Sequence, residues 1–157
     1  DIIVLGSIRR GKKKFSNIQR ETKISPEELN SILEELENKN LIQVEEKKGW
    51  FGKKIELKIT EKGSTDLDRR IFEIQEKWKY MKLIYERGDK QKLQEKMEEN
   101  KSLLPTMMFF GIMDMMMFSM MFSMMGMTMS DYVPAENMPE GGDPGMDDGG
   151  FDFDIGF

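Results

Sequence analysis

The sequence predicts a mainly α-helical fold with one small β-hairpin, continued by long helices, a methionine-rich helix and a disordered acidic tail. Apolar residues recur at helical spacing before residue 41 and again after residue 64. Between these stretches, two short runs alternate apolar and polar residues, which is typical of strands. Composition divides the chain into four parts, residues 1–63, 64–104, 105–130 and 131–157.

Two short helices are predicted at the start of the chain. One apolar helical face precedes Gly11, and its members are Ile2, Leu5 and Ile8. Ser16 and Gln19, three residues apart, form a capping box with Phe15 before it, which predicts a second helix over residues 17–22.

A third helix has the clearest start signal. Ser25 stands at the cap, Pro26 at the first helical position and Glu28 at the position that closes a capping box. A buried stripe follows at helical spacing, formed by Leu29, Ile32, Leu33 and Leu36. The helix is expected to end at residues 38–40.

A hairpin follows, with strands over residues 41–47 and 54–60. The connection over residues 48–53 holds two glycines for the turn and two aromatics, Trp50 and Phe51, at its tip. Three helices followed by a two-stranded hairpin is the element order of a winged helix-turn-helix.

Residues 1–63 resemble the winged-helix domain of the PadR/MarR type, common among archaeal and bacterial regulators. The residues that carry the resemblance are Ser25 and Pro26, the stripe of the third helix, Leu41 and Ile42 at the start of the wing, and Ile59-Thr60-Glu61-Lys62-Gly63 at its end. The resemblance implies that the third helix enters the DNA major groove while the wing contacts phosphate or the minor groove. It also implies a dimer formed by the helix after the wing.

Two basic clusters agree with a role in binding double-stranded DNA, because each lysine or arginine at a phosphate adds affinity without reading sequence. The wing cluster consists of Lys47, Lys48, Lys53 and Lys54 around Trp50. The second cluster consists of Arg9, Arg10, Lys12, Lys13 and Lys14.

The third helix is less suited to DNA. It has no basic residue before Lys39, and its acidic residues are Glu27, Glu28, Glu34, Glu35 and Glu37. Asn30 and Ser31 are its candidate base-reading residues. Backbone-led DNA binding is therefore expected over specific readout, and the alternative is a winged helix that serves as a protein-binding scaffold.

A long helix, capped by Ser64 or Thr65 and broken at Gly88, is predicted after the hairpin. Its apolar positions form a heptad seam of Leu67, Ile71, Ile74, Trp78, Met81 and Tyr85. We expect this seam to form a homodimer, and the alternative is that it packs back on the first 63 residues.

Twelve of the sixteen methionines lie in residues 107–129. Because methionine is unbranched and polarizable, such a segment suits an adaptable contact with apolar protein segments or with itself. The expected contact residues are Met113, Met117, Met120, Met121 and Met124. A small-residue stripe (Gly111, Ser119, Ser123, Gly126 and Ser130) favours association through one helical face. A membrane-spanning helix and a copper(I) site are less favoured alternatives, because Asp114 interrupts the segment and the chain has neither His nor Cys.

The tail is acidic and rich in glycine and proline, which predicts disorder. At its end Phe151, Phe153 and Phe157 alternate with polar residues and glycine, as in a strand that adds to the edge of a sheet. The tail could dock on the wing lysines through its aspartates, or it could keep the methionine segment soluble.

The chain lacks the residues of common catalytic sites, and we expect neither an enzyme nor a cofactor. The sequence therefore predicts a dimeric, cytoplasmic DNA-binding regulator. The alternative is an interaction or chaperone-like factor that uses the methionine-rich segment.

Overall fold

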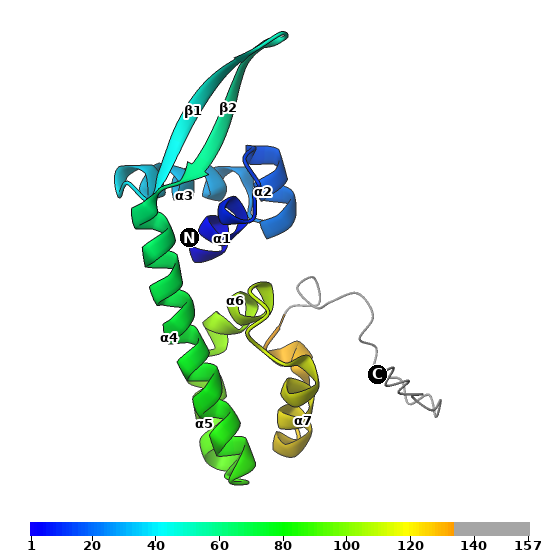
Figure 1. Ribbon diagram of the computed structural model, residues 1–157. Coiled ribbons are helices and arrows are strands. Elements are labelled where there is room, and N and C mark those ends of the chain that lie inside the picture. Colours follow the sequence, from blue (N-terminus) through cyan, green and yellow to red (C-terminus); the bar gives the residue numbers. More distant parts are fainter. Residues whose placement is uncertain (134–157) are drawn as a thin grey trace, which may run out of the picture.

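The computed structural model describes residues 1–133 and forms two bodies along one long helix, α4 (Figure 1). The head contains α1 (Ile2–Arg9), α2 (Phe15–Thr22), α3 (Pro26–Asn38), β1 (Ile42–Gly49) and β2 (Gly52–Ile59). The C-terminal body contains the distal part of α4 (Glu61–Glu86) with α5 (Lys90–Glu99), α6 (Leu104–Phe109) and α7 (Met115–Met125). Two short 3₁₀ helices, Lys101–Leu103 and Met129–Asp131, complete the described chain. The predicted mainly helical fold with one hairpin is confirmed. Of the predicted tail, residues 134–157 lie outside the described residues, whereas Tyr132 and Val133 are buried in the core of the C-terminal body.

The head has one apolar core, to which all three of its helices and the base of the wing contribute. Its fully buried members include Val4, Leu5, Ile18, Leu29, Leu36 and Leu67. The Ser25 hydroxyl accepts from the Glu28 backbone N–H at 3.3 Å, and Pro26 opens α3 as predicted. The Ser16 cap is wrong, because α2 begins at Phe15 with Lys14 at the cap position and no side-chain cap.

The wing, defined as β1, β2 and the turn between them, is a long antiparallel ribbon that projects from the head (Figure 1). Gly49 pairs with Gly52, so Trp50 and Phe51 alone make the turn. The backbone N–H of Leu57 donates to the carbonyl of Lys13 at 2.8 Å, which ties the loop between α1 and α2 to the second strand.

The helix α4 begins earlier than the sequence indicates. Thr60, and neither Ser64 nor Thr65, is its cap, with a side chain that accepts from the Gly63 N–H at 2.9 Å. The Thr60 N–H donates to the carbonyl of Leu41 at 3.0 Å, so one residue ends the wing and starts the helix.

The C-terminal body encloses a second core, rich in methionine and phenylalanine. Its buried members include Met81, Leu93, Met97, Met107, Phe118 and Met121. The expected single methionine-rich helix is wrong: the segment forms α6 and α7, separated by a break in which Asp114 caps α7. The small-residue stripe is divided too, because Gly111 and Gly126 have positive φ at or beyond helix ends.

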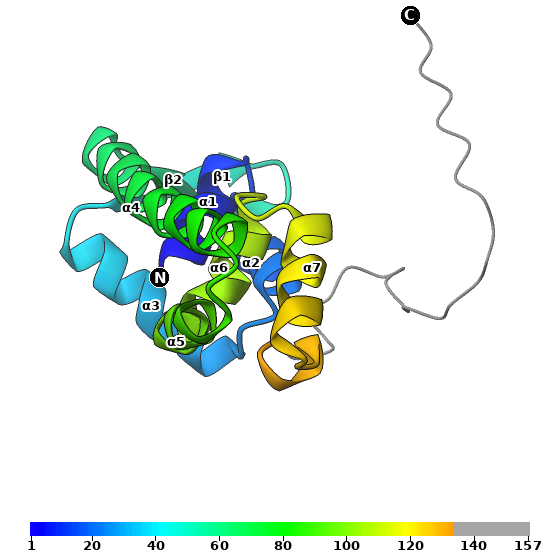
Figure 2. The ribbon, with the colours of Figure 1, turned by 90° about the horizontal axis from the view of Figure 1, so that it is seen from below.

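The two bodies meet where α6 packs on α1. A Cβ atom at Gly6 would lie 2.5 Å from the Phe110 ring. The ring can therefore pack on α1 only because residue 6 has no side chain. The Arg10 guanidinium lies 4.3 Å from the centre of the Phe109 ring and donates to the Phe109 carbonyl at 2.7 Å. In the view from below, α5, α6 and α7 lie in front of the head (Figure 2).

Candidate nucleic-acid interface

The wing concentrates positive charge near its tip. The strand register places Lys47 opposite Lys54 and Lys48 opposite Lys53, and all four side chains are exposed. Like charges directly opposite each other destabilise a ribbon, and an anion that binds both members of a pair relieves the repulsion. Because side chains alternate across a ribbon, one lysine pair lies on each face.

Two glutamates partly neutralise this charge. Glu56 forms an ion pair with Lys47, with 3.0 Å between Oε2 and Nζ. The same atoms of Glu46 and Lys53 lie 3.8 Å apart. The hydrogen bond with Lys47 lowers the pKa of Glu56, and it raises the pKa of Lys47. The positive charges of Lys13 and Lys14 also lower the pKa of Glu56, which places this basic loop within electrostatic reach of the wing.

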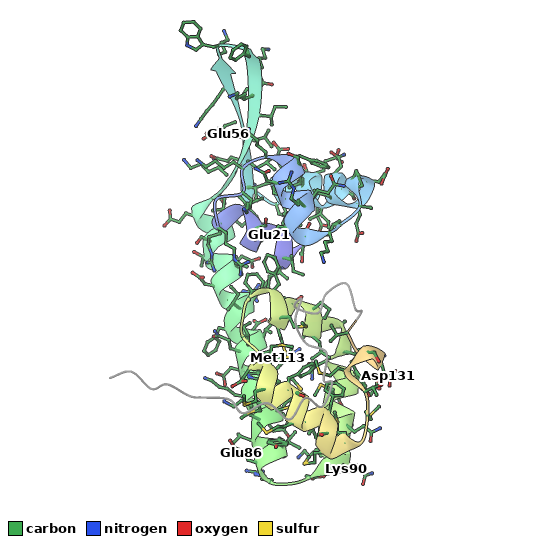
Figure 3. The ribbon with its side chains drawn as sticks, turned by 90° about the vertical axis from the view of Figure 1, so that its right-hand side faces the viewer. Glu21, Glu56, Glu86, Lys90, Met113 and Asp131 are labelled. Atoms are coloured by element: carbon green, nitrogen blue, oxygen red, sulfur yellow. The ribbon has the colours of Figure 1, made fainter. Side chains whose placement is uncertain are left out.

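The loop and the wing together form a basic surface. The Leu57–Lys13 backbone hydrogen bond holds the loop beside β2, and Figure 3 shows Glu56 on the wing above the head. Five exposed lysines of this surface form no ion pair with any residue in 1–133; they are Lys12, Lys13, Lys14, Lys48 and Lys54. Their ammonium groups are therefore available to form ion pairs with DNA phosphates.

The structure does not group the two predicted arginines with this surface. Arg9 forms an ion pair with Asp68 of α4. Arg10 lies 3.4 Å from Glu21 and contacts Phe109 of α6. Both arginines therefore connect elements of the fold, a role that sequence cannot distinguish from phosphate binding because the partners are distant along the chain.

The outer face of α3 is acidic. Leu29, Leu33 and Leu36 are buried, so the opposite face of the helix presents Glu27, Ser31 and Glu34 to solvent. Asn30, a predicted base reader, donates to the Glu34 carboxylate at 3.2 Å, and Ser31 is exposed. The face that would enter a groove thus carries two carboxylates at its centre.

Two basic residues at the C-terminal end of α2 were not among the predicted site residues. Arg20 of α2 and Lys23, which follows the helix, line a shallow depression together with Ser16, Gln19 and Ile24. Lys23 follows the end of α2 with φ +57°, so helical spacing in the sequence does not indicate that it lies near Arg20.

Most of the heptad seam is buried within the single chain. Leu67 and Ile71 pack in the head core, while Ile74, Trp78, Met81 and Tyr85 pack in or against the core of the C-terminal body. Packing on the first 63 residues, the alternative to a dimer seam, therefore accounts only for Leu67 and Ile71, because the other four residues pack against α5, α6 and α7. On the other side of α4, Phe72, Tyr80 and Leu83 form an exposed stripe that was not among the predicted contact residues.

The predicted methionine contact residues differ in access. Met113 and Met121 are buried in the core, Met117 and Met124 are partly buried, and Met120 is 43% exposed. Figure 3 shows Met113 within the lower body. The most exposed methionine of α7 is Met116, one turn before Met120.

No helix within residues 1–133 combines the length and apolar character that spanning a bilayer requires. Phe151, Phe153 and Phe157 lie outside the described residues.

Three helices followed by a basic two-stranded wing define the class of winged helix-turn-helix proteins. The model of the HxlR-like helix-turn-helix family matches residues 1–86, more than half of the chain, and the chain belongs to this family. The resemblance to known regulators therefore holds for the winged helix-turn-helix, but it does not extend to the PadR/MarR type. No curated protein and no solved structure gives a significant match to the chain. Membership of the HxlR-like family indicates a DNA-binding transcription regulator.

Proposed function

We propose that the protein is a dimeric transcription regulator that binds double-stranded DNA mainly through the phosphate contacts of its wing and of residues 12–14. The observation that carries this proposal is the junction between Lys13 and Leu57, which joins two basic segments into one surface. Its five lysines without ion pairs, if all meet phosphates, give a logarithmic salt slope of about −4.5. Such a regulator acts in the cytoplasm, and the proposal assigns it no catalysis and no cofactor.

The acidic outer face of α3 limits what this binding can read. Glu27 and Glu34 would lie close to phosphates if α3 entered the major groove deeply, and repulsion opposes that position. Asn30 is already hydrogen-bonded to Glu34. We therefore propose that the wing dominates binding and that preference for base sequence is weak.

The dimer is proposed to use the exposed stripe of α4. Phe72 is 59% exposed and Leu83 is 48% exposed, and both lie on the side of α4 opposite the buried seam. Charged residues of both signs flank these positions, including Arg69, Glu76 and Lys79. An antiparallel pair of α4 helices can match such charges against their opposites. Light scattering of Phe72→Asp against the unchanged chain tests this interface, and a monomer at micromolar concentration without the substitution argues against it.

Fluorescence anisotropy with random duplex DNA over a salt series tests DNA binding. Lys48→Ala with Lys54→Ala should make the slope less steep by about 2. The matched control is Lys77→Ala, an exposed lysine of α4 without an ion pair in residues 1–133, which should leave the slope unchanged. No binding at about 50 mM salt would contradict the proposal.

A second function is favoured by the exposed methionines together with the acidic α3. Met116 is 69% exposed beside Met120, and flexible methionine side chains suit apolar partner segments of varied shape. In this alternative the winged helix is a scaffold for an interaction or chaperone-like factor. Loss of peptide binding in Met116→Ser with Met120→Ser, without an effect on DNA, would support it.

A further inference from the structure

The tip of the wing carries two fully exposed aromatic side chains. Trp50 has a relative exposure of 102% and Phe51 of 101%, so no residue in 1–133 covers either ring. Figure 3 shows the side chains of the tip standing clear of the head. Single exposed apolar residues are ordinary on protein surfaces. Two adjacent large aromatics at the end of a projecting ribbon are unusual, because both rings are free to contact a molecule bound by the wing.

The ribbon holds these rings between charges on both faces. The Lys47–Lys54 pair lies on one face and the Lys48–Lys53 pair on the other, next to the turn. Gly52 has φ +117°, a backbone conformation that favours glycine, and it completes the tight return of the chain. A groove between two phosphate backbones places negative charge on both faces of an inserted ribbon. A lipid surface places its charge in one plane and matches this arrangement less well.

We propose that Trp50 and Phe51 stack on nucleobases, so that the wing tip binds DNA best where the base stack is already open. This inference rests on the proposed DNA binding and specifies which form of DNA the wing prefers. Stacking of an aromatic side chain on a base strengthens binding by about ten-fold or more. In an intact duplex, part of this gain is offset by the unstacking that a wedge requires. A bulge or mismatch removes that cost, while the lysines hold the flanking phosphates in either case.

The acidic face of α3 supports this assignment. Glu27 and Glu34 disfavour contacts of α3 with bases, so the aromatic tip is the part of the head best able to reach a base. Aromatic stacking tolerates any base, because every base has a π face. The preference is therefore for the structure of the DNA and not for its sequence.

Three labelled DNAs of equal length test the proposal with the full chain: a perfect duplex, a duplex with a central two-nucleotide bulge and a single strand. Anisotropy should show about ten-fold tighter binding to the bulged duplex than to the perfect one. Trp50→Ala with Phe51→Ala should remove this preference and keep the salt slope. Lys48→Ala with Lys54→Ala should reduce the slope by about 2 and keep the preference. Met116→Ala, which removes an exposed apolar side chain of α7 outside both the DNA surface and the proposed dimer stripe, is the control for loss of exposed apolar area.

Tryptophan emission gives an independent measurement. Trp50 is exposed while Trp78 is 5% exposed, so acrylamide quenches mainly Trp50 and bulged DNA should protect it. Salt-dependent binding with equal affinity for bulged and perfect duplexes would overturn the stacking inference and leave the proposed function intact. Absence of all DNA binding would overturn both. Protection of Trp50 by phosphatidylglycerol vesicles but not by DNA would assign the tip to membranes and refute the inference.

Discussion

Gly63 provides the sharpest test of how the wing is joined to the head. It lies in the first turn of α4, where an added Cβ atom would be 2.0 Å from the carbonyl oxygen of Leu41 and 2.9 Å from its carbonyl carbon. That oxygen cannot move freely, because it accepts from the Thr60 N–H at 3.0 Å and lies 3.1 Å from the Thr60 hydroxyl. Gly63→Ala must therefore separate the start of α4 from the base of the wing.

The expected cost follows from three contributions. Overpacking of a well-packed site costs about 1–3 kcal/mol. Weakening of the Thr60 hydrogen bond to Leu41 adds about 1 kcal/mol. The higher helix propensity of alanine offsets about 1 kcal/mol. The net destabilisation is about 1–3 kcal/mol, which lowers the melting temperature by roughly 3–9 °C in a chain of this size.

Urea denaturation followed by circular dichroism measures this change. The matched control is Ser64→Ala, which alters the next residue of the same helical turn and should stay within about 0.5 kcal/mol of the unchanged chain. If Gly63→Ala is as stable as Ser64→Ala, the close packing of α4 against Leu41 does not control the stability of the head.

Three other changes test the C-terminal body and its attachment. Asp114→Ala should destabilise the chain by about 1 kcal/mol in thermal unfolding, because its carboxylate accepts two backbone N–H groups of α7 at 2.9 and 3.2 Å, while Asp114→Asn should retain most of the cap. Arg10→Ala should cost about 1–2 kcal/mol and speed hydrogen exchange in α6, because it removes the contacts with Phe109; unchanged exchange would contradict this. Burial, followed by the hydrogen bond to Glu98, raises the pKa of Tyr132 to about 12. The unfolded tyrosine loses its proton near pH 10 and the folded one near 12, so about 2–3 kcal/mol of stability should be present below pH 10 and lost as the pH rises to 12, a loss absent from Tyr132→Phe.

The head was predictable from sequence because local signals and tertiary packing agree there. The Ser25 cap and the Leu29–Leu36 stripe specify α3 without knowledge of the rest of the chain. The start of α4 was not predictable in the same way. Thr60 reads as the end of a strand, and only its contacts with Leu41, nineteen residues earlier, show that it caps a helix.

The methionine-rich segment shows where periodicity fails. A buried face is recognised by contrast with polar positions, and a segment in which methionine, phenylalanine or isoleucine occupies most positions offers little contrast. The break between α6 and α7 depends on Gly111, with φ +63°, and on the Asp114 cap. In the sequence, the charge of Asp114 argues against burial of the segment. In the structure, its carboxylate accepts from the backbone N–H groups of Met116 and Met117 at the start of α7.

The candidate DNA surface was predictable only in part, because charge alone does not reveal its partners. The wing lysines lie where the hairpin places them, yet Arg9 and Arg10 differ from Lys12 only through contacts with α2, α4 and α6. The same contacts explain why the head and the C-terminal body are not independent. Glu21 of α2 accepts from Ser7 and pairs with Arg10, which also holds the end of α6. One charged network thus connects the helix-turn-helix to the methionine-rich body, so a partner that displaced α6 would act directly on the helix that precedes α3.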